Sequence, residues 1–443
     1  MDPLRHVKLA VRSLEAYSLA ARPARVKINQ NENPYELPDG LKKRVLEKAF
    51  ARSWSRYPDF DPRELLEALA RFSGWRPDGI LAGNGSNELI EALLLATVGP
   101  GTHVVIPEPT FSLYALLTTI LGGEPVRVPM RRTGPGDAGT VVDRAAGQGL
   151  AAAGGQSRND VGRIDARGPR PRAASSMARA GFGAMRPILR RSEPANMDTT
   201  ETDATGITGP FVYEVEPLLD ARRRSAAPVT IVCSPNNPTG TCLPLADVER
   251  LCGDGDTLVV IDEAYHEFSG QTVVSLLERH PNLVVLRTFS KAMALAGLRV
   301  GYLLASPELV REVGKARLPY NLNFFSQMAA MAAIEEWSAL ERTVRRLADA
   351  RDRLLERLAD IPGVRAWPSR ANFFLLELPS ADPRAVFESL HRRGVLVRDV
   401  TSYPMLDRCL RVSVGSEEEN EAFLYALGAA LGEAGMPLEQ GRA

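Results

Sequence analysis

Three short apolar runs, each with a polar residue soon after it, constrain the fold of this chain more than any other feature. The runs span residues 229–232, 258–261 and 283–286. Their length and continuous apolar character are typical of strands that are buried on both faces of a sheet. In open α/β sheets, ligands bind at the carboxyl ends of the strands. We therefore expect one sheet to bring Asn237, Asp262 and Lys291, which follow the three runs, to a common edge.

Lys291 lies in the segment TFSKAMALAGLR, just beyond the third run. Most lysines are solvated surface charges, so its position alone is weak evidence for a function. A lysine that is held in a partly desolvated pocket has a lowered pKa, and its amine then reacts with aldehydes. Arg299 follows eight residues later and is a candidate for anchoring a phosphate.

The composition is that of a globular protein with more than one domain. With 443 residues, the chain exceeds the usual size of a single hydrophobic core. Lysine plus arginine and aspartate plus glutamate both number 54. Because no net charge favours nucleic acid or an acidic membrane surface, the expected partners are small molecules. The charged N-terminal segment is unlike a secretory signal, and no apolar run has the length of a membrane span.

Cysteine usage indicates the redox environment of the chain. Cys233, Cys242, Cys252 and Cys409 show no CxxC spacing and no accompanying histidine cluster. This pattern predicts reduced thiols in a cytoplasmic protein. We expect no metal site.

The order of predicted strands and helices indicates two domains and an N-terminal arm. We expect residues 50–318 to form a large domain and residues 319–443 a smaller α+β domain, to which an N-terminal arm of residues 1–49 belongs. Within this arm, a short amphipathic start precedes the polar run VKINQNENPYELP, which we expect to be extended. Residues 131–208 interrupt the large domain. They contain twelve arginines, no lysine and many glycines, alanines and prolines, a composition that buries too little apolar surface to fold. This low-complexity stretch is predicted to be a disordered insertion in a surface loop.

A glycine-rich turn in GILAGNGSNELIEALLLAT joins a predicted strand to a predicted helix. The backbone amides of Ser86 and Asn87 would open that helix and form an anion site. The spacing matches neither a Walker loop nor GxGxxG, so a structural turn is the alternative. Phe111 follows the next strand, where it either stacks on a planar ring or fills the core.

Two arginines on predicted strands of the smaller domain are candidates for binding an anionic substrate. They are Arg398 and Arg411. A guanidinium group pairs bidentately with carboxylate or phosphate, which suits both positions if the strands flank a cleft. The alternative is that either residue is a surface charge.

Several motifs, in a fixed order, carry a family resemblance. SPNNPTG, DEAY and TFSKAMALAGLR resemble the cofactor-binding motifs of pyridoxal-phosphate enzymes of type I fold. The series KINQNENP, RYPD, GNGSNE, PTF, RLPYN, VLVRD and LRVSVG is similar to the class-II-like histidinol-phosphate aminotransferases, and it covers nearly the whole chain outside the insertion. The resemblance implies an α/β fold with a mostly parallel seven-stranded sheet between helices in the large domain.

The resemblance also implies a role for each residue at a matching position. Lys291 would bind pyridoxal phosphate covalently and move a proton on the substrate carbon. Asp262 would keep the pyridine nitrogen protonated, so that the ring accepts electrons. Asn237 and Tyr265 would donate hydrogen bonds to the ring oxygen, and Phe111 would stack on the ring. The phosphate would be bound by Ser86, Asn87, Ser290 and Arg299. Tyr57 would reach the phosphate from a neighbouring subunit, which implies a homodimer with shared sites.

The implied reaction transfers an amino group between histidinol phosphate and 2-oxoglutarate, a step of histidine biosynthesis. One site must then accept both a phosphate and carboxylates. We expect Arg398 and Arg411 to recognise these anions. Asn33 and Tyr35 of the arm are similar to a segment that faces the substrate.

Three alternatives stay open. An aminotransferase for aromatic amino acids would need an apolar pocket in place of the phosphate contacts. A threonine-phosphate decarboxylase uses the same cofactor residues and also binds a phosphate, but it releases carbon dioxide. A regulator that senses the cofactor would join this fold to a DNA-binding domain, and no basic helix-turn-helix precedes residue 30.

Overall fold

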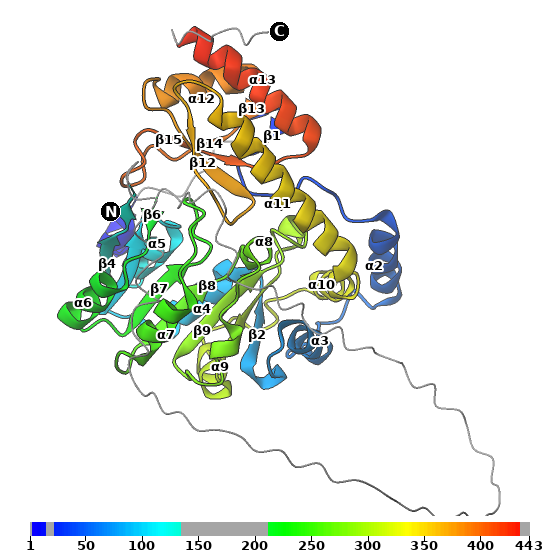
Figure 1. Ribbon diagram of the computed structural model, residues 1–443. Helices are drawn as coiled ribbons and strands as arrows, with labels where there is room; N and C mark the ends of the chain where they lie inside the picture. The colour runs from blue at the N-terminus through cyan, green and yellow to red at the C-terminus, as the bar shows by residue number, and fades with distance from the viewer. Residues whose placement is uncertain (1, 15–21, 134–210, 435–443) are drawn as a thin grey trace, which may run out of the picture. The chain divides into compact units, whose positions relative to one another are not determined.

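The computed structural model describes residues 2–14, 22–133 and 211–434 (Figure 1). The predicted insertion at 131–208 therefore lies outside the described residues except for its first three. There, strand β5 (Arg131–Arg132) pairs antiparallel with β6 (Phe211–Val212). The start of the predicted insertion is thus paired with the segment that follows it.

A seven-stranded sheet forms the centre of the larger part of the structure. Its strand order is β2-β10-β9-β8-β7-β3-β4. Strand β10 is antiparallel to both of its neighbours, and the other strand pairs are parallel. The predicted mostly parallel sheet of seven strands is therefore confirmed. The strands are β2 (Ile80–Gly83), β3 (His103–Glu108), β4 (Glu124–Pro129), β7 (Val229–Cys233), β8 (Leu258–Asp262), β9 (Leu283–Thr288) and β10 (Gly301–Leu304).

Both faces of this sheet are covered, which explains the apolar runs in the sequence. Side chains alternate between the faces of a strand. In β9, Val285 belongs to one hydrophobic cluster, whereas Val284 and Leu286 belong to another. The helices associated with this part are α2 (Asp39–Ala51), α3 (Arg63–Ser73), α4 (Ser86–Thr97), α5 (Leu113–Ile120), α6 (Val215–Ser225), α7 (Leu245–Gly253), α9 (Pro307–Gly314) and α10 (Phe324–Glu335).

Short elements connect these strands and helices. The helices of one turn or so are α1 (Leu9–Arg12) and α8 (His266–Ser269). The 3-10 turns are η1 (Pro3–His6), η2 (Pro77–Gly79), η4 (Val274–Leu276) and η5 (Ala296–Leu298). Among the described residues, no helix combines the length and the apolar character needed to cross a bilayer.

A second, antiparallel sheet with order β11-β12-β15-β14 forms a smaller core with three helices. The N-terminal segment joins it, because β1 pairs in parallel with β13. The α+β character predicted for the C-terminal part is present, while the exact boundaries of the two predicted domains stay a prediction. The elements are β1 (Val26–Lys27), β11 (Arg365–Ala366), β12 (Phe373–Glu377), β13 (Val395–Leu396), β14 (Arg398–Asp399), β15 (Cys409–Ser413), α11 (Trp337–Ala359), α12 (Pro383–Arg392) and α13 (Glu417–Glu433).

Helix α2 (Asp39–Ala51) starts within residues 1–49, which the sequence predicts to be an N-terminal arm, and ends two residues beyond them. Its buried Leu41 and Val45 pack in the same hydrophobic cluster as the large sheet. The run VKINQNENPYELP, which is predicted to be extended, ends at Pro38, and α2 begins at the next residue. Apolar residues at helical spacing follow that run in the sequence, which explains the helix.

Candidate active site

The carboxyl ends of β7, β8 and β9 lie side by side at one edge of the large sheet. In the register of these strands, Cys233 is opposite Asp262, and Asp262 is opposite Leu286. Two further backbone bonds continue the pairing, from the Ser234 amide to Asp262 O (2.9 Å) and from the Glu263 amide to Leu286 O (2.8 Å). The loops that carry Asn237 and Lys291 therefore leave the sheet next to Asp262.

Asp262 is a buried carboxylate at the end of β8, only 3% exposed. Tyr114 Oη donates a hydrogen bond to its Oδ2 (2.6 Å), and the Ala264 amide donates to its Oδ1 (3.0 Å). Burial raises the pKa of Asp262 to about 6, although both hydrogen bonds favour the charged form. The site thus holds a carboxylate that is poised to pair with a buried cation.

The amine of Lys291 is desolvated beside the arm. Its Nζ donates to Gln30 O (2.9 Å) and lies 6.0 Å from the centroid of the Tyr265 ring. Burial, followed by the positive charge of Arg411, lowers the pKa of Lys291 to about 7. A substantial share of the amine is then neutral at neutral pH, as a nucleophile requires.

Tyr265 and Asn237 are each held by a residue from another part of the chain. Asn31 Nδ2 donates to Tyr265 Oη (3.0 Å), and Arg411 Nη1 donates to Asn237 Oδ1 (2.6 Å). Burial raises the pKa of Tyr265, so its hydroxyl stays protonated. The site therefore offers a hydroxyl and an amide between Lys291 and Arg411.

An anion cradle lies at the start of α4. Gly85 has φ +83°, and a Cβ there would lie 2.3 Å from Arg299 Nη2, so the guanidinium of Arg299 packs directly on the turn. Arg299 Nη1 donates to Ser290 Oγ (2.9 Å). Ser86, the first residue of α4, is buried, and Asn87 is exposed beside it. Backbone amides at a helix start next to a guanidinium form a site for phosphate.

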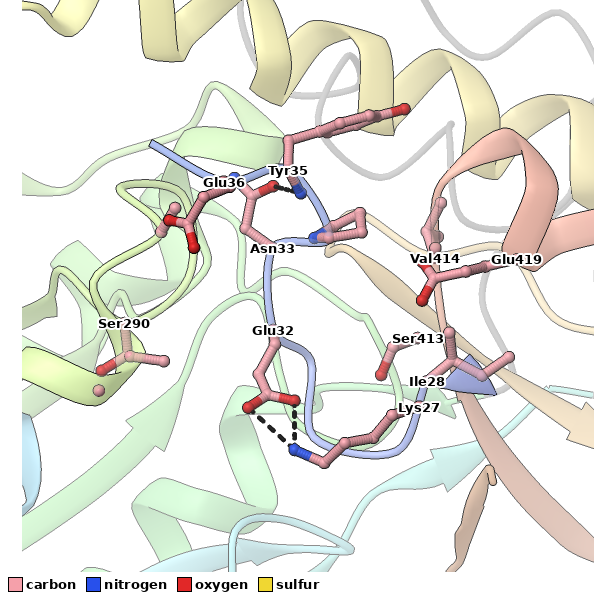
Figure 2. A pocket seen from close by; sticks show the side chains of 15 residues that line it. Lys27, Ile28, Glu32, Asn33, Tyr35, Glu36, Ser290, Ser413, Val414 and Glu419 are labelled. Atoms are coloured by element: carbon pink, nitrogen blue, oxygen red, sulfur yellow. Dashed lines mark hydrogen bonds and ion pairs between the residues drawn. The ribbon is translucent and has the colours of Figure 1, made fainter. Parts of the chain in front are cut away.

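A pocket of about 270 Å³ adjoins this cradle, because Ser290 lines it together with the arm (Figure 2). Asn33 Nδ2 donates to Ala292 O (3.2 Å), next to Lys291, and Asn33 Oδ1 accepts from the Tyr35 amide (3.0 Å). The guanidinium of Arg346 lies 4.6 Å from the centroid of the Tyr35 ring. Asn33 and Tyr35, which are predicted to face the substrate, thus line a pocket next to the segment that carries Lys291.

Not all candidates meet at this edge. Arg398 is half-buried on β14, where it pairs in register with Arg411 of β15. Phe111 is half-buried and contacts the ring of Tyr114 edge-on, with centroids 5.6 Å apart. Tyr57 is 80% exposed and stacks on Tyr320 (centroids 4.6 Å). Within one chain, Tyr57 is therefore part of a surface cluster.

Two residues that the sequence reading missed hold the site together. They are Tyr114 and Asn31, which bond Asp262 and Tyr265. Tyr114 follows Phe111 by three residues, and this spacing is a signal that could have suggested it. Asn31 lies within the quoted motif KINQNENP, yet nothing local distinguishes it from Asn29 or Asn33.

Taken together, these groups suit one kind of ligand. A nucleophilic amine, a buried carboxylate, a hydroxyl with an amide, and an anion cradle match a planar aldehyde that carries a ring nitrogen, a ring oxygen and a phosphate. Among the residues that the structure describes, no cluster of histidine, cysteine, aspartate or glutamate is arranged to hold a metal ion.

Comparison with known proteins gives a consistent result. The sequence matches the family described as aminotransferase class I and II over residues 24–140 and 211–427. A histidinol-phosphate aminotransferase of Chlorobium phaeovibrioides is 32% identical over 428 residues, which are 96% of this chain and 97% of the relative. One from Desulfitobacterium hafniense is 33% identical over 419 residues and covers 95% of each chain.

Solved structures of similar fold point the same way. The crystal structure of histidinol-phosphate aminotransferase from Sinorhizobium meliloti, in complex with pyridoxal-5'-phosphate, has a TM-score of 0.73 at 23% identity and covers 97% of this chain and 98% of its own. L-threonine-O-3-phosphate decarboxylase from Porphyromonas gingivalis has a TM-score of 0.64 at 20% identity and covers 92% of this chain and 99% of its own. At these identities the two structures establish the fold alone.

Proposed function

Because the chain belongs to the class I and II aminotransferases, we propose that it is a pyridoxal-phosphate-dependent enzyme that transfers an amino group between histidinol phosphate and 2-oxoglutarate. The products are imidazole-acetol phosphate and glutamate, and the pathway is histidine biosynthesis. The observation that carries the proposal is the Lys291 amine, with a pKa of about 7, at the edge where Asp262 ends β8. The names of the relatives with near-complete coverage support the choice of substrate.

The donor set of the site fits pyridoxal phosphate. When bound, this cofactor supplies an aldehyde carbon for the lysine amine and a ring that accepts electrons. Lys291 would hold the aldehyde, Asp262 would keep the ring nitrogen protonated, and Phe111 would stack on the ring. The residues that would bind the phosphate are Ser86, Asn87, Ser290 and Arg299. Tyr265 and Asn237 would donate hydrogen bonds to the ring oxygen.

Lys291 also performs the proton transfer. With substrate bound, Lys291 Nζ would be a free base within a desolvated site. The pKa of about 7 would let this amine take a proton from the substrate α-carbon, hold it on Nζ and release it again at neutral pH. Arg411 and Arg398 bind the anionic ends of the substrates, and Asn33 and Tyr35 line the substrate side.

The substrate assignment is tested by product analysis on the purified holoenzyme. We expect glutamate to form from histidinol phosphate and 2-oxoglutarate at a higher kcat/KM than from phenylalanine or tyrosine. Release of carbon dioxide from threonine phosphate should be absent. Faster turnover of the aromatic amino acids, or carbon dioxide release, would assign the site to one of those other reactions.

The Tyr114→Phe variant should bind the cofactor more weakly at low pH. The hydrogen bond from Tyr114 favours the charged form of Asp262, so its loss moves the pKa of Asp262 upward from about 6. A neutral carboxyl cannot pair with a protonated ring nitrogen. Cofactor affinity, measured against pH by absorbance, should therefore begin to fall at a pH about one unit higher than in the wild type. Identical pH profiles would contradict the role of this bond.

We also propose a homodimer in the cytoplasm. Exposed aromatic and apolar side chains occur at the end of α2, on the segment after it and on the segment before α10, namely Phe50, Trp54, Tyr57, Phe60, Leu318 and Tyr320. Ring contacts connect part of this aromatic patch, from Tyr57 and Phe60 to Tyr320. Apolar clusters of this kind mark interfaces, and most soluble oligomers are symmetric dimers. The structure describes all four cysteines as free thiols, which suits a reducing compartment.

Substituting Trp54 with aspartate should dissociate the proposed dimer. Trp54 is 72% exposed, so a single chain loses little stability, whereas an interface would bury a new charge. Sedimentation should give about twice 48.2 kDa for the wild type and a monomer for the variant. An exposed substitution away from the patch, Leu245→Asp, is the control. A monomeric wild type would refute the dimer.

A further inference from the structure

An ion pair faces the pocket beside Lys291. Lys27 Nζ lies 3.1 Å from Glu32 Oε1 and 2.8 Å from Glu32 Oε2, and both residues line the pocket with their side chains 47% and 38% exposed (Figure 2). Both charges act on the reactive amine. Glu32 raises the pKa of Lys291 and Lys27 lowers it, although burial and Arg411 have the larger effects. The pair therefore lies within electrostatic reach of the chemistry.

The backbone of this pair is fixed, while its charged ends are open. Lys27 belongs to β1, which pairs with β13. The residue before Glu32, Asn31, makes four hydrogen bonds. Its amide donates to Ser413 Oγ (2.9 Å) and its Nδ2 donates to Tyr265 Oη (3.0 Å), while its Oδ1 accepts from Ser413 Oγ (2.9 Å) and its backbone O accepts from Asn372 Nδ2 (3.1 Å). The two side chains are thus presented to the pocket from a rigid segment.

This ion pair costs little to open. Solvent screens a half-exposed pair and weakens it, so a ligand group of either sign can replace one partner. Arg411 differs, because it is buried and donates to Asn237 Oδ1 (2.6 Å) and to Asn29 O (2.7 Å). Arg411 does not line the pocket, but Ser413 of the same strand does, so a charge that is held in place lies near a pocket whose lining pair offers both signs.

We propose that Lys27 and Glu32 recognise the far ends of the two amino donors in turn, an inference that rests on the proposed function. With glutamate or 2-oxoglutarate, Lys27 leaves Glu32 and binds the γ-carboxylate. With histidinol phosphate, Glu32 leaves Lys27 and accepts a hydrogen bond from the imidazole N–H. In each case the unused partner stays solvated at the open side of the pocket. The same ion pair would then let one site bind both the carboxylate of glutamate and the imidazole N–H of histidinol phosphate.

The test uses two variants that preserve side-chain size, Lys27→Met and Glu32→Gln, in the holoenzyme. Lys27→Met should raise the KM for glutamate about tenfold and leave the kcat/KM for histidinol phosphate within about twofold. Glu32→Gln should do the reverse. Glutarate, a dicarboxylate that cannot react, gives a readout besides turnover: its inhibition constant should rise about tenfold in Lys27→Met alone. Lys315→Met is the control, since Lys315 pairs with Glu312 on the surface.

Three outcomes would overturn the inference. Equal losses for both substrates in both variants would mean that the pair acts through Lys291 or through folding, and the pH dependence of kcat would then shift as well. No change in either variant would mean that the far ends bind elsewhere. An unchanged inhibition constant for glutarate in Lys27→Met would remove the carboxylate site. Failure of the proposed function looks different, because the wild type itself would then not convert histidinol phosphate.

Discussion

The Lys291→Ala protein should lose turnover by a factor on the order of 10⁴ or more and keep its fold. The variant has neither the amine that binds the aldehyde nor the base that moves the proton. Within the described part of the chain, Lys291 Nζ donates one hydrogen bond, to Gln30 O, so its removal there costs few contacts. The measurement is kcat/KM together with the thermal unfolding midpoint, and Lys315→Ala, at an exposed lysine, is the control. Residual activity within about tenfold of the wild type would remove Lys291 from the mechanism.

In the cofactor-free protein, the contribution of Lys291 to folding stability should depend on pH. The pKa of Lys291 is about 7 when folded and 10.5 by reference. Between these values the unfolded chain binds more protons, so the stability contribution of Lys291 rises with pH. Wild type should therefore gain stability relative to Lys291→Ala as the pH is raised from about 7 to about 10.5. Denaturant unfolding at several pH values measures the difference, and a difference that does not change with pH would contradict the buried amine.

The second large effect is expected for Asp262→Asn, which should lower kcat by about 10²- to 10³-fold. The amide has nearly the same shape as the carboxylate but carries no charge to keep the ring nitrogen protonated. Because Asp262 is one of the residues proposed to hold the cofactor, its affinity should fall too. Turnover and cofactor titration check the two parts separately, with Asp256→Asn, an exposed aspartate, as the control. Full turnover in Asp262→Asn would refute its role.

Loss of stability cannot explain such a result for Asp262→Asn. Burial raises the pKa of Asp262 from 3.8 to about 6, so the folded protein binds more protons between these values. The contribution of Asp262 to stability therefore falls as the pH rises through that range. Without cofactor, the Asn variant should be at least as stable as the wild type at pH 7, and its advantage should shrink toward pH 4.

The apolar runs predicted the central strands because a strand buried on both faces leaves a continuous record in the sequence. Strands β7, β8 and β9 begin at Val229, Leu258 and Leu283, the residues that open the three runs. The placement of Lys291 after β9 follows from the same pattern. The motif resemblance, rather than periodicity, assigned the chemistry to this edge.

The contacts that hold the site could not be predicted in this way. Tyr114 bonds Asp262, and Asn31 bonds Tyr265, but each pair is far apart in the sequence and shares no local pattern. Arg411 was assigned to the substrate, and the structure shows that it also donates to Asn237. Such links depend on how two sheets and an N-terminal segment come together, which propensity and periodicity do not describe.

The most direct test of the central claim is to locate the cofactor on the chain. The purified holoenzyme is treated with borohydride, which converts the lysine–cofactor linkage to a stable amine, and is then digested with trypsin. We expect the added mass on the peptide of residues 288–299, because a modified Lys291 is no longer cleaved and Arg299 is the next site. An adduct on any other lysine, with residues 288–291 recovered unmodified, would contradict the assignment of Lys291.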